Sequence, residues 1–283
     1  MKWEENIHPE FGRSLYADNG VVQLVIPLEY GIRIGHFSYI GEENVFYVQP
    51  KVMKELSTED GWRIRGGHRL WLAPENEDTY CPDNAPIAYE IQGEDIILTQ
   101  EVDVELGVRK SIQISFGEEA SVHLTHRIEN CNQEPITRSL WAVSVVAPGG
   151  TEYIPLGQRE GGMSHWHRIS WWDHTCLGDE RVTYQKDMIK IQHLPIDKRY
   201  KIGVGHPAEP VQYVNNGVVF EKSYDFRPDS VYVDGDVSFE TFFCLYMAEI
   251  ESLSPLYTIA PGKCAEHKET WKLYRCDERG TIL

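Results

Sequence analysis

Apolar and polar residues alternate over short runs along most of this chain, with turn-forming residues between the runs. Positions 122, 124, 126 and 128 hold Val, Leu, His and Ile, and the positions between them hold polar residues. A period of two residues is typical of a β-strand with one buried face, whereas a helix has a period of 3.6. We count roughly fifteen or more short strands of this kind and no persuasive helix.

Further strands are expected at 21–27, 45–48, 88–91, 96–100, 108–116, 136–147, 186–192, 199–204, 218–224, 247–253, 256–259 and 267–274. Residues 231–245 are expected to form a hairpin around the turn Asp234-Gly235-Asp236. The 283 residues contain no recognisable linker or repeat, and sandwiches of this size often remain undivided. The sequence therefore predicts an all-β fold, a large antiparallel β-sandwich, in a single domain that spans residues 1–283.

The formal net charge of −17 limits the classes of partner. Nucleic acid and anionic membrane surfaces both require a basic patch, so neither is expected. No stretch approaches eighteen apolar residues, so no membrane span is predicted. A neutral ligand such as a small-molecule carbohydrate is compatible with an acidic protein. The charge does not indicate the oligomeric state.

Six cysteines are scattered along the chain without a CxxC pair, and no Cys/His group has the spacing of a zinc site. The first twelve residues, MKWEENIHPEFG, lack the apolar core of a signal peptide. These features favour a reducing cytoplasm as the location. We expect neither a metal nor another cofactor.

The stretch RGGHRLWLAPE, from Arg65 to Glu75, concentrates several chemically versatile side chains beside a Gly-Gly turn. If it is extended, His68 and Leu70 share one face and Arg69 and Trp71 share the other. The alternative is a strand end with a packed tryptophan and a solvated arginine. The density of functional groups beside the turn makes this stretch a candidate for a site.

Glu249 and Glu251 lie two residues apart in AEIESL, so in a strand they point to the same face. Two carboxylates on one face repel each other, and the pKa of one is expected to be raised. A raised pKa suits a general acid or base that works near neutral pH. The alternative is an ordinary solvated strand face.

The segment from Gly161 to His174 holds three histidines and three tryptophans. A metal such as zinc could in principle be held by His165 and His167 together with the carboxylate of Glu160 or Asp173. The spacing, however, does not fix a third ligand. The tryptophans either line a sugar groove or pack in the interior.

The C-terminal segment FCLYMAEIESLSPLYTIAPGKCAEHKETWKLY, from Phe243 to Tyr274, resembles the galactose mutarotase (aldose 1-epimerase) proteins. RGGHRLWLAPE, the loop NEDTYCPDNAP and the strand SLWAVSVVAPGG resemble an uncharacterised branch of that superfamily. The resemblance covers most of the chain and implies a galactose mutarotase-like supersandwich. That fold also hosts domains of lyases and hydrolases, so it does not determine the function.

In mutarotases a glutamate takes the proton of the anomeric hydroxyl, a histidine protonates the ring oxygen, and an arginine holds the sugar. By resemblance the glutamate corresponds to Glu249 or Glu251, the histidine beside Gly-Gly to His68, and the arginine to Arg69. A second mutarotase histidine corresponds to Trp141, six residues after Pro135. An indole cannot transfer a proton there, although it can stack on a sugar.

We therefore expect a carbohydrate-binding protein that interconverts the anomers of a sugar or sugar derivative. The alternatives are a non-catalytic carbohydrate-binding protein and a lyase or hydrolase that uses the same carboxylates. The expected catalytic residues are Glu249, Glu251 and His68. The expected substrate-binding residues are Arg69, Trp71, Glu75, Trp141, His165 and His167.

Overall fold

The structure is a computed structural model that describes residues 1–49, 61–156, 167–208 and 210–277. It is 55% strand and 3% helix, so the prediction of an all-β sandwich is confirmed. The described helices are η2 (Glu77–Tyr80) and α1 (Val233–Asp236), four residues each. Neither described helix has the length or the apolar character to cross a bilayer.

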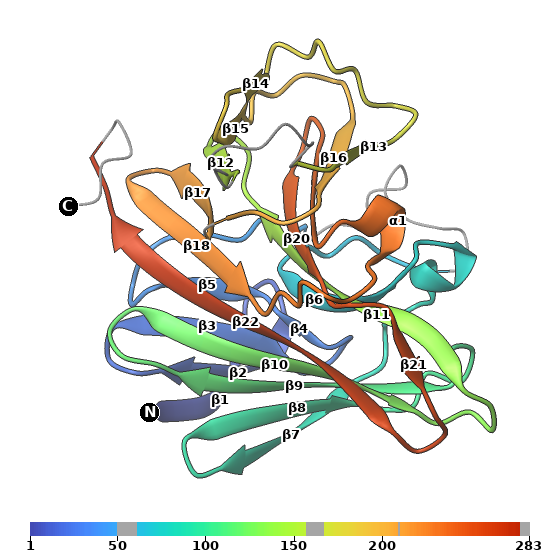
Figure 1. Cartoon of the computed structure of the whole chain (residues 1–283). Helices are drawn as coiled ribbons and strands as arrows, with labels where there is room; N and C mark the ends of the chain where they lie inside the picture. The colour runs from blue at the N-terminus through green and yellow to red at the C-terminus, as the bar shows by residue number, and fades with distance from the viewer. Residues whose placement is uncertain (50–60, 157–166, 209, 278–283) are drawn as a thin grey trace.

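The largest sheet has ten antiparallel strands, and several of them run side by side across the lower half of Figure 1. In spatial order they are β14 (Val182–Tyr184), β15 (Met188–Gln192), β12 (Thr151–Pro155), β17 (Val211–Asn215), β18 (Val218–Tyr224), β22 (Cys264–Arg275), β10 (Ser121–Asn130), β9 (Val108–Phe116), β8 (Asp95–Gln100) and β7 (Ile87–Gln92).

The second sheet has eight strands and carries the stretches that the sequence marks as candidate sites. Its order is β13 (Ile169–Trp171), β16 (Tyr200–Val204), β19 (Phe239–Phe243), β20 (Ala248–Leu253), β11 (Ile136–Val146), β6 (His68–Ala73) and β4 (Arg33–Ile34), and β21 (Tyr257–Ile259) pairs with the start of β11. A smaller sheet contains β1 (Lys2–His8), β2 (Gly12–Asp18), β3 (Val22–Pro27) and β5 (His36–Tyr39).

The main core consists of the side chains that the three sheets turn toward one another. In β10 the even positions 122, 124, 126 and 128 are buried and 123 and 127 are exposed, as the alternation predicts. Leu140 of β11 and Ile250 of β20 belong to the same cluster as Ile112 of β9 and Leu24 of β3. A second, smaller cluster covers the other face of the eight-stranded sheet and includes Trp71, Trp141 and Leu253. Strands β6 and β11 are therefore buried on both faces, which fits their nearly continuous apolar sequence.

The predicted hairpin at 231–245 is wrong. Asp234 and Gly235 have φ values of 54° and 86°, in the left-handed region, and the Val237 amide donates to the Val233 carbonyl at 3.1 Å, so the segment labelled α1 is a single tight turn. The Asp236 carboxylate accepts a hydrogen bond from the Tyr232 amide at 3.0 Å, which fixes this turn. The strand that follows, β19, pairs with β16 and β20.

Strand β12 places a carboxyl group inside the main core. Glu152 of β12 is 2% exposed, and its Oε2 accepts a hydrogen bond from the Thr241 hydroxyl of β19 at 2.7 Å. Its Oε1 has no hydrogen-bond partner among the described residues. Burial, with repulsion from Glu251, raises the pKa of Glu152 to about 8. The folded protein therefore holds this carboxyl largely protonated at neutral pH.

We expect Glu152→Gln to stabilise the protein at pH 8 and to have little effect at pH 5. The pKa of Glu152 is about 8 in the folded state and 4.5 in the unfolded state, so between these two pH values the folded state binds more protons. The contribution of Glu152 to stability therefore falls as pH rises from about 4.5 to 8. A glutamine keeps an acceptor for Thr241 and does not titrate. Each kcal/mol gained corresponds to a rise of about 2–4 °C in Tm. Thermal melts at both pH values check this, with the exposed Glu180→Gln as control. Equal shifts at pH 5 and pH 8 would contradict it.

Candidate functional site

Acidic and basic side chains form two neighbouring rows on the eight-stranded sheet, on the face turned away from the main core. In the first row Arg69 lies opposite Val143, Val143 opposite Glu251, and Glu251 opposite Glu240. In the second row Val145 lies opposite Glu249, Glu249 opposite Phe242, and Phe242 opposite Lys201. Residues directly opposite in paired strands share a face. We call this surface, with Arg69, Lys201, Glu240, Glu249 and Glu251, the carboxylate face.

Glu249 is the accessible member of the predicted pair of carboxylates. Its side chain is 12% exposed, and its Oε1 lies 3.3 Å from Nη2 of Arg69. Burial, with repulsion from Glu251, raises the pKa of Glu249 to about 7, although Arg69 opposes the rise. At neutral pH this carboxyl is therefore able both to accept and to release a proton.

Glu251 is held in place and fully buried. The Trp141 indole donates a hydrogen bond to its Oε2 at 2.7 Å, and Lys201 Nζ lies 3.5 Å from the same oxygen. Burial raises the pKa of Glu251, and Lys201 and the indole hydrogen bond oppose the rise. Its other oxygen has no hydrogen-bond partner among the described residues. A side chain so enclosed is suited to holding its neighbours rather than to exchanging protons with a ligand.

Lys201 is a central residue of this face that the sequence did not reveal. Its Nζ lies 2.8 Å from Glu240, 3.5 Å from Glu251 and 3.7 Å from Glu75. Burial alone would lower the pKa of Lys201, but these carboxylates raise it, so the amine stays charged. Burial places the pKa of Glu240 well above its ordinary value. Two buried cations, Arg69 and Lys201, thus stabilise a face that is rich in acids.

Indole rings hold both cations in position. The Arg69 guanidinium lies 3.7 Å from the centroid of the Trp71 ring, and Lys201 Nζ lies 4.5 Å from Trp141 and 4.7 Å from Trp172. The quadrupole of an aromatic face attracts a cation at these distances. Trp71 and Trp141, at 8% and 3% exposure, are more buried than a stacking surface for a sugar requires. Trp172 is the half-buried indole that lies next to open space.

An open hollow of about 600 Å³ adjoins the carboxylate face. Trp172, beside Lys201, is one of its lining residues, and another is His174, whose ring lies 6.3 Å from that of Phe242. The remaining lining residues are Ser170, Trp171, Asp173, Asp234 and Gly235. The volume is within the range of small-molecule sites. Trp172 and His174 therefore connect this hollow to the acids and cations of the sheet.

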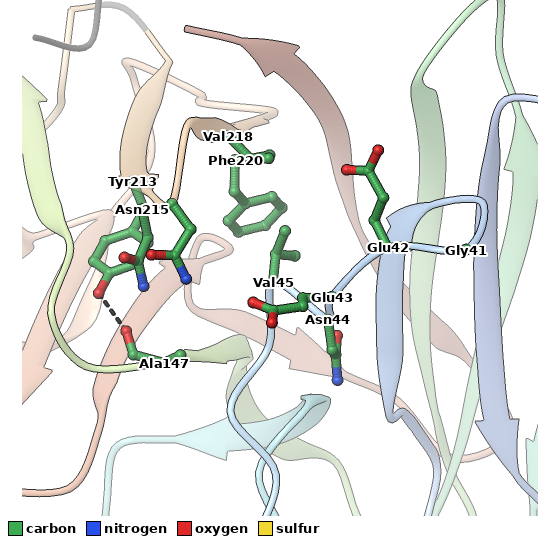
Figure 2. A pocket seen from close by; sticks show the side chains of 11 residues that line it. Gly41, Glu42, Glu43, Asn44, Val45, Ala147, Tyr213, Asn215, Val218 and Phe220 are labelled. Atoms are coloured by element: carbon green, nitrogen blue, oxygen red, sulfur yellow. Dashed lines mark hydrogen bonds between the residues drawn. The ribbon is translucent and has the colours of Figure 1, made fainter. Parts of the chain in front are cut away.

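A second hollow, of about 380 Å³, lies elsewhere (Figure 2). Tyr213 and Phe220 line one side, and the loop that carries Glu42 and Glu43 lines the other. Two of its polar groups have partners: the Tyr213 hydroxyl donates to the Ala147 carbonyl, and Glu42 pairs with Arg275. This hollow serves below as a reference site.

No protein-family model matches the chain, and no curated protein matches it in sequence. Solved structures match it along nearly its whole length. A TPR-domain containing protein from Parabacteroides distasonis is 13% identical with a TM-score of 0.64, over 96% of this chain and 49% of that one. The chain thus spans about half the length of that protein.

Two galactose mutarotase-like proteins match over both chains. The protein from Lactobacillus casei is 8% identical with a TM-score of 0.61, over 92% of this chain and 100% of that one. The protein from Clostridium acetobutylicum is also 8% identical, with a TM-score of 0.59, over 97% and 98%. The chain has the galactose mutarotase-like fold. Identities this low establish the fold alone, so the chemistry has to be derived from the residues.

In this mutarotase-like fold His68 does not lie with the other predicted site residues. Its side chain is fully buried on the core side of β6, opposite to Arg69. Its Nδ1 lies 2.9 Å from the Ser144 hydroxyl, and its Nε2 lies 2.7 Å from Nε2 of His126. Burial holds the pKa of His68 well below its usual value, so the ring is neutral. The assignment of His68 as a proton donor to a ligand on the face of Glu249 is therefore corrected.

His68, His126 and Glu269 place three possible metal-ligand atoms within 4.8 Å of one another. Hydrogen bonds already occupy these atoms. Nδ1 of His126 donates to the His267 carbonyl at 3.1 Å, so its Nε2 is free to accept the proton of His68. Glu269 accepts from Lys222 at 2.8 Å and from the Trp271 indole at 2.9 Å. The cluster is thus a satisfied interior network around a buried ion pair.

The remaining predicted residues lie in different places. Glu75 is partly exposed beside Lys201 and accepts a hydrogen bond from the Tyr80 hydroxyl. His165 lies outside the described residues. His167 is half-buried just before β13, at the edge of the sheet opposite to β4. The structure therefore brings together Arg69, Glu75, Trp71, Trp141, Glu249 and Glu251.

Proposed function

We propose that this protein binds an aldose over the carboxylate face and the adjoining hollow, and interconverts its anomers with Glu249 as general base. The observation that carries this proposal is the environment of the Glu249 carboxyl group. This group is the partly exposed carboxyl of the pair, its pKa is about 7, and Arg69 holds it from one side. A catalytic pKa near the working pH gives the most effective proton transfer.

The reaction requires two proton movements. Glu249 takes the proton of the anomeric hydroxyl while the bond between the anomeric carbon and the ring oxygen breaks, which leaves an open-chain aldehyde. The ring oxygen gains a hydrogen bond and then a proton from solvent water, while Glu249 returns the proton it took to solvent. Closure on the other face of the aldehyde reverses both transfers. We assign the contact with the ring oxygen to His174. Burial and neighbouring cations lower the pKa of His174, so it is neutral, and a neutral imidazole can polarise an oxygen through its N–H.

A second candidate is a carbohydrate-binding protein without catalysis. Two features favour it: His68 lies in the interior, and Trp141, which by resemblance corresponds to a mutarotase histidine, hydrogen-bonds Glu251. The two candidates share the same site and differ only in turnover. Polarimetry with freshly dissolved aldoses separates them. Mutarotation above the buffer rate supports the isomerase, and binding without acceleration supports the second candidate.

Sugar binding is expected to quench tryptophan fluorescence. Trp172 is half-buried at the hollow, where the C–H face of a pyranose can stack on its indole. Titration of the emission with a panel of aldoses measures this. Trp172→Phe should remove most of the change, whereas Trp3→Phe, on the exposed strand β1, should leave it intact. Unchanged emission at millimolar concentrations of every aldose would contradict carbohydrate binding at this hollow.

A further inference from the structure

The carboxylate face and its hollow hold more acids than cations. The acids among the described residues are Glu75, Glu240, Glu249, Glu251, Asp173 and Asp234. The cations are Arg69 and Lys201, which pair with these acids, and the exposed Arg199, which lies close enough to His174 to lower its pKa. Six carboxyl groups against three cations leave the region with an excess of negative charge wherever the carboxyls are ionised.

The two cations inside this region are buried, and each pairs with a carboxylate. Arg69 is 2% exposed and lies between Trp71 and Glu249. Lys201 is 7% exposed and lies among three carboxylates and two indole rings. Nε and Nη1 of Arg69 have no hydrogen-bond partner among the described residues, but this side chain is buried. A ligand phosphate or carboxylate would have to compete with the paired carboxylates for both cations.

Most of the named groups that reach the surface are acids, and Arg199 is the exposed cation beside them. The side chain of Glu75 is 36% exposed and that of Glu249 is 12% exposed. Asp173 at the hollow is also exposed. Burial raises the pKa of Glu249 and of Glu251, and repulsion from a neighbouring carboxylate adds to the rise in each, so the face retains protons. An ammonium group on a ligand can take the place of such a proton.

We propose that this site selects sugars by charge: it takes neutral aldoses, prefers their amino derivatives, and rejects sugar phosphates and uronic acids. The proposal rests on the proposed sugar site and specifies its substrate class. Fixed charges near a ligand mainly give specificity, by making the wrong charge unfavourable.

The test compares four related ligands by calorimetry at pH 6.5 and low salt. They are the neutral aldose that binds most tightly in the fluorescence panel and its 2-amino, 6-phosphate and uronic acid derivatives. We expect the amino sugar to bind several-fold more tightly than the neutral aldose, and both anionic derivatives to bind at least about tenfold more weakly. Raising the salt concentration to 0.5 M should narrow these differences, because it screens partly exposed charges.

Two variants locate the effect. Glu75→Gln should reduce the preference for the amino sugar over the anionic derivatives, whereas Glu94→Gln, an equal charge change in the exposed turn between β7 and β8, should not. If the phosphate or uronic acid derivative binds as tightly as the neutral aldose, charge selection is overturned while sugar binding stands. If none of the four ligands binds, the proposed function and charge selection both fail.

Discussion

Glu249→Gln is expected to slow anomer interconversion by about 10²–10⁴-fold, the usual contribution of positioned proton transfer. Glutamine keeps the shape of the side chain and an oxygen for Arg69, 3.3 Å away, but it cannot take up the proton. Sugar affinity should therefore stay within a few-fold of that of the unmutated protein. Polarimetry gives the rate and calorimetry gives the affinity.

The pH profile provides an independent readout of the same residue. The base must be ionised, and its pKa is about 7. The rate of the unmutated protein should therefore rise as pH increases through about 7, and Glu249→Gln should lack this rise. Glu251→Gln is the matched control, because Glu251 is fully buried and bonded to Trp141. It should weaken binding or stability more than turnover. A larger loss of turnover in Glu251→Gln than in Glu249→Gln would reverse the assignment.

Lys222→Met is expected to be the most destabilising of the substitutions discussed. Lys222 is fully buried; its Nζ lies 2.8 Å from Glu269 and donates to the carbonyls of Ala142 in β11 and Ile250 in β20. Lys222 and the neighbouring histidines lower the pKa of Glu269 despite its burial. Removal of the lysine leaves a buried charge without its partner, which costs about 3–5 kcal/mol. Denaturant unfolding measures the loss.

The double variant Lys222→Met, Glu269→Leu distinguishes a charge effect from a packing effect. Replacing both members of a buried pair by apolar residues is often close to neutral, so the double variant should recover much of the lost stability. Because the folded pKa of Glu269 is depressed, its stabilising contribution is present above the unfolded value of 4.5 and is lost as pH falls below it. The deficit of Lys222→Met should therefore shrink at low pH. Additive losses in the double variant would show that the ion pair is not the source of the effect.

Much of the fold follows from local patterns in the sequence. The two-residue alternation of β10 gives the buried positions directly, and the spacing of Glu249 and Glu251 correctly places both on one face of β20. The prediction of a hairpin at Asp234-Gly235 is wrong because left-handed residues also close tight turns between segments that do not pair as strands, and local sequence does not distinguish the two.

The site was harder to predict because long-range pairing builds it. Lys201 lies in β16, two strands away from Glu251, and no local pattern relates the two residues. His68 illustrates a conflict between two lines of reasoning. Alternation in β6 places it on the face opposite to Arg69, whereas the family resemblance assigned both to one sugar site. The structure follows the alternation, because a one-residue offset in a strand reverses the face of a side chain.

A crystal structure of the protein with the tightest-binding neutral aldose tests the central claim most directly. We expect the sugar in the hollow lined by Trp172 and His174, with its anomeric hydroxyl within about 2.6–3.2 Å of the Glu249 carboxylate. His68 should remain in the interior without contact to the ligand. A sugar bound instead in the hollow of Figure 2, with Glu249 free of contact, would contradict the assignment of the carboxylate face as the sugar site.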